Sequence, residues 1–165
     1  MHPTHCIIHL TEEATKGTYR PAAESKAKQA IQSAISGIEY KSIRRKYQRI
    51  FIMVTPETDI SKLKEILLTI PSIASFGMAT KAPAEKGRDT AQAVLEASDA
   101  SSFRVKVKIS DRQHKRSLDE TTQDLSKELA QRTNKTIDFI NPKITLYVEI
   151  LENGWYCYTE QIVSN

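Results

Sequence analysis

The sequence predicts an α+β protein built from two units in tandem, and three observations support this prediction. The first half alternates short apolar runs with helical patterns in the order strand, helix, strand, strand, helix, strand. Residues 80–89 then interrupt the apolar periodicity with Pro, Gly and charged side chains, as linkers do. The second half combines helical patterns with further strands. We therefore expect domains at residues 1–79 and 90–165, joined by a linker at residues 80–89.

The first unit is expected to begin with a short apolar strand at residues 6–10. A helix should start at Arg20, because Pro21 fits the first turn of a helix. Small apolar side chains then recur at helical spacing until Gly37, which ends the pattern. The sequence therefore predicts a strand followed by a closely packed helix.

An antiparallel pair of strands is expected next, at residues 39–46 and 49–54. Asp59 can cap a short apolar helix, and residues 73–78 form the last strand of the unit. These elements have the order β-α-β-β-α-β. That order is the ferredoxin-like arrangement, in which two split β-α-β units share an antiparallel sheet of four strands.

The second unit should be an α/β domain with two helices. The first spans residues 90–97, and the second begins after Ser117, because Ser117 and Glu120 have the spacing of a capping box. Three leucines of the second helix are expected to face the core: Leu118, Leu125 and Leu129. Further strands are expected at residues 137–140, 144–150 and 155–162.

The strand expected at residues 103–108 is the most informative segment, because its side chains alternate between apolar and basic. A period of two places these apolar side chains on one face: Phe103, Val105 and Val107. The opposite face carries three cations: Arg104, Lys106 and Lys108. The apolar face fixes the strand in a core, and the row of cations offers a site for phosphates.

Two further groups of basic residues favour the same interpretation. One lies at the predicted hairpin of the first unit: Arg44, Arg45, Lys46 and Arg49. The other lies in the polar loop after the basic strand: Arg112, His114, Lys115 and Arg116. For any single cation a solvated surface is the simpler interpretation. The whole set favours phosphate contact, because both groups can follow one nucleic-acid backbone.

Composition agrees with a globular protein that has a mildly basic surface. The 165 residues are 39% hydrophobic and 27% charged, with a formal net charge of +4 and an isoelectric point near 9.0. That balance favours polyanionic partners without identifying one. No apolar run approaches the roughly 20 residues of a membrane helix, and the N-terminal residues do not form a signal-peptide pattern. With two cysteines and no C-x-x-C, we expect a cytoplasmic protein with no membrane partner.

Catalytic and metal-binding motifs are scarce in this sequence. It contains no G-x-x-x-x-G-K-[ST], G-x-G-x-x-G, H-E-x-x-H or G-x-S-x-G motif. On a strand, His5 and His9 would share a face while Cys6 points away, so a polar strand face is favoured over a metal site. Core packing is favoured for Cys157 and Trp155 over nucleophilic or stacking roles. We expect no catalytic residue, metal or cofactor.

Several short motifs follow one another along the chain in a family-specific order. The segment EEATKGTYRPAAE keeps five signature positions: Glu12, Lys16, Gly17, Arg20 and Glu24. YQRIFIMV keeps Arg49, IPSIASFGMAT closes the first unit, and FRVKVKISDR keeps Asp111 and Arg112. DFINPKITLYVEI keeps Asp138, Asn141 and Pro142, and a Tyr-x-Tyr strand is formed by Tyr156 and Tyr158. By these motifs, residues 102–162 resemble a THUMP domain, and the whole chain resembles the N-terminal half of tRNA 4-thiouridine synthetase.

The sequence also departs from the family pattern. His114 and Lys115 stand where the family often has Phe-Pro, so the loop need not keep the family conformation. The family's adenylating domain with its phosphate loop has no counterpart in these residues, and neither Cys6 nor Cys157 matches its sulfur-carrying cysteine.

The resemblance implies a tRNA-binding module that is not itself an enzyme. In the family, THUMP holds the acceptor (3′ CCA) end of tRNA while the ferredoxin-like domain orients it toward a catalytic site. The expected partners are therefore tRNA and a separate or fused adenylating sulfurtransferase domain, in 4-thiouridine formation. The expected RNA contacts are Lys16, Arg20, Arg44, Arg45, Arg49, Arg104, Lys106, Lys108, Arg112, Lys115, Arg116, Asn141 and Lys143.

Two other functions stay open on the sequence alone. The chain could be a THUMP adaptor for a different tRNA modification, such as cytidine acetylation. It could instead be a ferredoxin-like regulatory or assembly module whose basic faces bind protein or a small anion. Salt-dependent binding of tRNA, weakened by removal of the CCA end, distinguishes the first function from the last.

Overall fold

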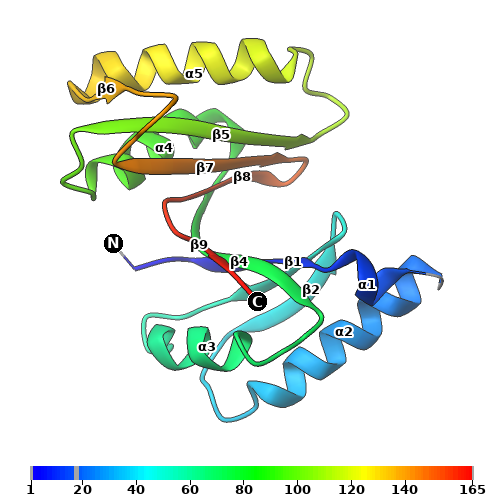
Figure 1. Ribbon diagram of the computed structural model, residues 1–165. Coiled ribbons are helices and arrows are strands. Elements are labelled where there is room, and N and C mark those ends of the chain that lie inside the picture. Colours follow the sequence, from blue (N-terminus) through cyan, green and yellow to red (C-terminus); the bar gives the residue numbers. More distant parts are fainter. Residues whose placement is uncertain (1, 17–18, 165) are drawn as a thin grey trace. The chain divides into compact units, whose positions relative to one another are not determined.

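Helices and strands alternate through two α+β units, which the computed structural model describes over residues 2–16 and 19–164 (Figure 1). One unit contains residues 2–78 together with the end of the chain from residue 161, and the other contains residues 79–160. The predicted α+β class is confirmed. Within the described residues, no helix has the length and apolar character needed to cross a bilayer.

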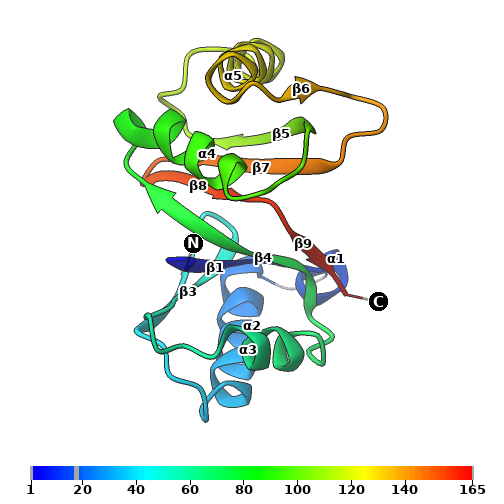
Figure 2. The same ribbon diagram turned by 90° about the vertical axis from the view of Figure 1, so that its left-hand side faces the viewer.

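The first unit has the predicted order of elements, with one additional short helix, α1, after the first strand. The elements are β1 (His5–Leu10), α1 (Glu12–Thr15), α2 (Arg20–Ala34), β2 (Ser42–Lys46), β3 (Arg49–Met53), α3 (Ile60–Leu67) and β4 (Ile73–Ala82). The strand order is β2-β3-β1-β4, and β3 pairs antiparallel with both β1 and β2. This is the ferredoxin-like arrangement, with α2 and α3 on one face of the sheet (Figure 2).

The core of the first unit lies between that sheet face and the two helices. Alternate strand residues such as Cys6, Ile8 and Ile50 pack with Ile31 of α2 and Leu63 of α3. These side chains recur at the strand period of two and the helix period of 3.6, as the sequence suggested.

Local interactions and backbone angles explain where α3 begins and where the β2–β3 hairpin turns. The carboxylate of Asp59 accepts the backbone N–H of Lys62 at 3.1 Å and so caps α3 as predicted. The β2–β3 hairpin turns at Tyr47 and Gln48, whose φ angles of 52° and 61° match a two-residue turn of the left-handed type. Neither residue is glycine, yet the turn occupies the two residues that the sequence left between the strands expected at 39–46 and 49–54.

The second unit is built around a mixed sheet. Its elements after β4 are a 3₁₀ turn (Ala84–Lys86), α4 (Gly87–Glu96), β5 (Ser102–Ser110), α5 (Leu118–Thr133), β6 (Thr136–Ile137), β7 (Ile144–Leu151) and β8 (Gly154–Tyr158). The strand order is β4-β8-β7-β5-β6. β5 runs parallel to β6 and β7, while β8 runs antiparallel to β7 and β4. Helices α4 and α5 cover one face of this sheet (Figure 2).

The linker expected at residues 80–89 is replaced by regular structure. β4 continues to Ala82, because residues 80–82 pair with residues 155–157 of β8, and α4 already begins at Gly87. The glycine permits close packing here: a Cβ at Gly87 would lie 2.2 Å from Cδ2 of Trp155. The Pro, Gly and charged residues at positions 80–89 therefore mark a short connection between β4 and α4.

Three smaller expectations for the second unit also differ from the structure. Leu118 is half exposed, whereas Leu125 and Leu129 are buried as predicted. The strand expected at residues 137–140 is only the two residues of β6. The run at residues 155–162 is divided into β8 and β9 (Gln161–Val163), and β9 belongs to the first unit, where it pairs with residues 75–77 of β4.

Gly87→Ala tests the close approach between α4 and Trp155. We expect the free energy of unfolding to fall by about 1–3 kcal/mol, because the added methyl group would overlap the indole ring. Gly37→Ala is the matched control, since a Cβ there has no neighbour within 4 Å. Thermal unfolding followed by far-ultraviolet circular dichroism measures both variants, and equal stabilities would contradict the packing described.

Candidate nucleic-acid interface

The basic strand has the two-faced character that the sequence predicted. Phe103, Val105 and Val107 of β5 are buried with α4 and α5 against them. On the opposite face, Arg104 is half-buried while Lys106 and Lys108 are exposed. Alternate residues of a strand are about 6.6 Å apart, so the three cations form a row along the sheet.

Neighbouring strands orient this row of cations. The guanidinium of Arg104 donates from Nε to Oγ1 of Thr145 on β7 at 3.1 Å. Lys106 is paired in register with Tyr147, whose ring stacks on Tyr158 of β8 with centroids 5.0 Å apart. Neither Lys106 nor Lys108 makes an ion pair within the described part of the chain. Their ammonium groups are therefore available to an anionic partner.

The carboxylate next to this row is already engaged. Glu149 is 1% exposed and pairs in register with Lys108. Its Oε2 accepts the hydroxyl proton of Tyr158 at 2.6 Å. Glu149 therefore presents no exposed carboxylate beside Lys106 and Lys108.

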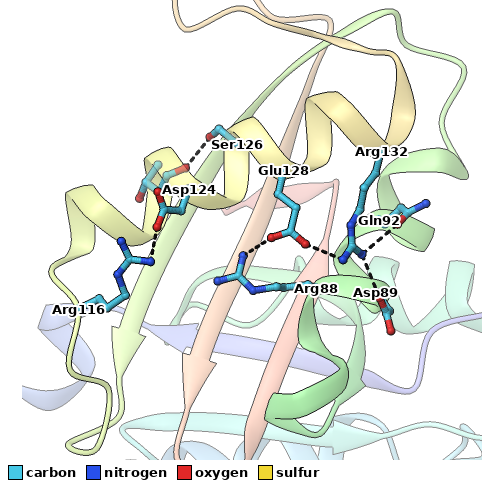
Figure 3. A network of polar contacts seen from close by, with 9 residues as sticks. Arg88, Asp89, Gln92, Arg116, Asp124, Ser126, Glu128 and Arg132 are labelled. Atoms are coloured by element: carbon cyan, nitrogen blue, oxygen red, sulfur yellow. Dashed lines mark hydrogen bonds and ion pairs between the residues drawn. The ribbon is translucent and has the colours of Figure 1, made fainter.

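The three predicted contacts in the loop after β5 differ in whether a carboxylate of the protein pairs with them. Arg112 and Lys115 are exposed. Arg116 instead pairs with Asp124 of α5 (Figure 3). It also lies 3.6 Å from Oε2 of Glu120 in the same helix. Two neighbouring carboxylates thus neutralise Arg116 and tie it to α5.

Charges on the helical side of the second unit are balanced in the same way. Glu128 of α5 accepts from Arg88 of α4 at 2.7 Å and from Arg132 at 2.6 Å (Figure 3). Arg132 also contacts Asp89 at 2.9 Å. These pairs hold α4 to α5 and engage both arginines with carboxylates.

Asn141 and Lys143 lie at the N-terminal end of β5, near Arg104. The backbone N–H of Lys143 donates to Oγ of Ser102 at 3.0 Å. Oδ1 of Asp138 accepts the N–H groups of Ile140 and Asn141, both at 3.0 Å. The bonds from Asn141 and then Ile140 lower the pKa of Asp138 below its ordinary value, because they favour the carboxylate. The side chains of Asn141 and Lys143 are exposed.

In the first unit, a buried carboxylate holds two of the predicted RNA contacts. Glu24 of α2 is 4% exposed. Its two oxygens accept from Nε of Arg20 at 3.0 Å and from a terminal nitrogen of Arg45 at 3.1 Å. The three side chains join α2 to β2, so Arg20 and Arg45 have a structural role.

The remaining predicted contacts of the first unit differ in exposure. Arg49 is 8% exposed and donates to the carbonyl of Tyr47 at 2.7 Å, which pins the β2–β3 turn. Lys16 and Arg44 are exposed. Gly17, which the family resemblance also singled out, lies outside the described residues. Lys46, which belongs to the same predicted hairpin group, is exposed with its Nζ 5.2 Å from the centre of the Tyr47 ring.

Potential catalytic and metal-binding residues are engaged elsewhere. Trp155 and Cys157 belong to the core of the second unit, which confirms their predicted packing role. His2 contacts the carbonyl oxygen of Thr55 at 2.7 Å, and His5 contacts the hydroxyl of Thr4 at 2.9 Å. No cluster of three His, Cys, Asp or Glu side chains suited to a metal ion occurs in residues 2–16 and 19–164.

An apolar hollow in the first unit has no catalytic character. Its volume is about 370 Å³, and it lies between α2 and the segment that joins α3 to β4. The lining is mostly alanine together with Ile70 and Pro71, and its one charged side chain is Lys26. Such a surface offers shape and apolar contact, without an acid–base pair.

Alanine substitutions of Arg45 and Arg44 test whether Arg45 has a structural role that Arg44 lacks. Arg45→Ala should lower the free energy of unfolding by about 1–2 kcal/mol, because the buried carboxylate of Glu24 loses a hydrogen-bond donor. Arg44→Ala, one residue away on the exposed face of the same strand, should stay within about 0.5 kcal/mol of the parent. Urea unfolding of both variants gives the comparison. Equal losses would show that Glu24 does not depend on Arg45.

Both thiols should be inert in the folded protein. Cys6 and Cys157 are buried, and burial raises the pKa of Cys157 to about 12 and that of Cys6 further still. At pH 8 a thiol reagent such as Ellman's reagent should titrate neither cysteine until guanidinium unfolds the chain, when both react. Rapid labelling of one thiol before unfolding would contradict the burial.

Comparison with known proteins gives the same two domains. Residues 5–77 match the ThiI ferredoxin-like domain, and residues 85–160 match the THUMP domain. Probable tRNA sulfurtransferases of Moorella thermoacetica and Staphylococcus epidermidis are 25% and 24% identical to this chain. The matches cover 96% and 97% of this chain but 41% and 40% of those proteins. The chain thus spans about two fifths of the length of the curated relatives it matches.

Solved structures agree on the fold. PH1313 from Pyrococcus horikoshii has a TM-score of 0.85 at 22% identity, over 98% of this chain and 55% of that one. A 4-thiouridine synthetase in complex with RNA and ATP has a TM-score of 0.75 at 19% identity, over 99% of this chain and 42% of that one. Family models and relatives together confirm the resemblance seen in the sequence. The chain belongs to the THUMP-domain proteins in which a ThiI ferredoxin-like domain precedes THUMP, and it is homologous to part of the tRNA sulfurtransferases.

Proposed function

We propose that this chain binds tRNA by its acceptor (3′ CCA) end and presents it to a tRNA-modifying active site, in 4-thiouridine formation. The observation that carries the proposal is the row of Arg104, Lys106 and Lys108 on one face of a THUMP domain. The similarity to probable tRNA sulfurtransferases supports tRNA as the polyanion and thiolation as the modification.

The chemistry of this face suits a nucleic-acid backbone. Lysine ammonium groups attract phosphates through charge alone, so the interaction holds a strand without reading its sequence. Arg104 is oriented by Thr145 and can present its guanidinium in one direction. A face of this kind positions a substrate, and an active site elsewhere determines which nucleoside is changed.

The proposed contacts are the predicted residues whose charged or polar groups are not held by carboxylates or by the main chain. They are Lys16, Arg44, Arg104, Lys106, Lys108, Arg112, Lys115, Asn141 and Lys143. For Arg20, Arg45, Arg49 and Arg116 we propose a supporting role, because each already has a protein partner.

A non-catalytic role is part of the proposal. Both thiols are buried, and burial raises the pKa of each, so neither is suited to carry sulfur at neutral pH. The modification would then be performed by an adenylating sulfurtransferase domain, fused to this chain or separate from it.

Binding of tRNA at increasing salt tests the electrostatic part of the proposal. The logarithm of the association constant should fall linearly with the logarithm of salt concentration, with a slope of several units, because each phosphate contact releases counterions. The double variant Lys106→Glu, Lys108→Glu should bind at least tenfold more weakly at about 0.1 M salt and show a slope shallower by about two. Filter binding or fluorescence anisotropy provides the constants.

A matched control separates the site from the change in net charge. Lys62→Glu with Lys127→Glu makes the same change in net charge at exposed positions on α3 and α5, and should change affinity much less. Equal losses in the two double variants would remove the β5 face from the interface. If tRNA trimmed of its CCA end binds as tightly as intact tRNA, the acceptor-end part of the proposal fails.

A further inference from the structure

Two large apolar side chains project from the connection between β6 and β7. Phe139 is 60% exposed and Ile140 is 94% exposed. They lie in residues 138–143, here named the Asp138 loop, which is part of the orange connection visible at the edge of the sheet in Figure 2. Neither side chain was singled out by the sequence, because an apolar pair after a strand normally continues that strand into the core.

The Asp138 loop is held in one conformation by hydrogen bonds at both ends. The N–H of Asp138 donates to the carbonyl of Phe103 at 2.9 Å, and the N–H of Lys143 donates to Oγ of Ser102 at 3.0 Å. Within the loop, the carboxylate of Asp138 accepts from Ile140 and Asn141. Because the loop is already ordered, Phe139 loses little conformational entropy when it binds a partner.

The charges around the loop indicate what kind of partner fits it. Lys143 is exposed within the loop, and Arg104 lies next to the residues of β5 to which the loop is bonded. The one acidic side chain of the loop, Asp138, directs Oδ1 at backbone N–H groups. An aromatic face flanked by cations suits a partner with flat bases and a phosphate backbone better than an apolar or acidic peptide.

We propose that Phe139 is a stacking platform for one unpaired base of the RNA bound by this unit, while Lys143 and Arg104 hold the adjoining phosphates. Only an unpaired nucleotide can offer its face, because bases inside a duplex are already stacked on their neighbours. Asn141, an exposed residue two positions further along the same loop, would contact the edge of that base. The inference rests on the proposed function and adds a contact that selects single-stranded RNA over duplex RNA.

A fluorescent base analogue measures the stacking directly. The probe is a short RNA hairpin with a single-stranded 3′ tail of four nucleotides, in which 2-aminopurine replaces one tail base at a time. At one tail position the parent protein should quench the fluorescence. Phe139→Ala should abolish that quenching and weaken binding about tenfold, whereas Phe139→Tyr should retain both, because it keeps the aromatic face.

Controls separate stacking from general damage and from failure of the proposed function. Leu118→Ala removes another half-exposed apolar side chain from the same unit and should leave affinity and quenching unchanged. Circular dichroism of each variant verifies folding. If the parent binds the tailed RNA but Phe139→Ala binds and quenches equally well, the stacking inference is overturned while RNA binding stands.

Three other outcomes also decide against the inference. An equal loss of affinity for a blunt hairpin without the tail would show that Phe139 does not act through an unpaired base. A parent protein that binds no tailed RNA at all would reject the proposed function and the stacking inference together. If Phe139→Ala loses binding to a protein partner while its RNA affinity is unchanged, Phe139 docks a protein and does not stack on a base.

Discussion

The parallel pairing of β5 with β7 is the constraint on which the basic face of this protein depends. Backbone hydrogen bonds fix the register from Phe103 opposite Ile144 to Ser110 opposite Leu151. A slip by one residue would send Lys106 and Lys108 into the core beneath α4 and α5, at the cost of burying two unpaired charges. Core packing therefore determines the direction of the cations as firmly as any direct contact could.

The basic side chains fall into two groups with different roles. Arg20 and Arg45 hold the buried Glu24, Arg116 is tied to α5, and Arg49 supports a turn. Guanidinium groups perform these structural tasks well because they donate in several directions at once. Lysines, which bind as mobile point charges, predominate on the open β5 face. The two kinds of cation cannot be distinguished by counting basic residues.

Much of this organisation could be read from the sequence. Alternation at residues 103–108 correctly predicted a two-faced strand, and the capping residues Asp59 and Ser117 marked two helix starts. The exceptions depend on contacts between residues far apart in the chain. Gly87 suggested a linker but packs against Trp155, and Arg45 suggested an RNA contact but meets a carboxylate 21 positions earlier. Propensity and spacing contain no information on such partners.

The pairing of β9 with β4 has a consequence for synthesis on the ribosome. Residues 161–163 complete the sheet of the unit that begins at residue 2, although the whole second unit lies between them in the chain. Domains generally fold in the order in which they emerge. The unit translated first must therefore wait for its last strand until the other has been made, and it leaves the edge of Ser75–Gly77 without that partner in the meantime.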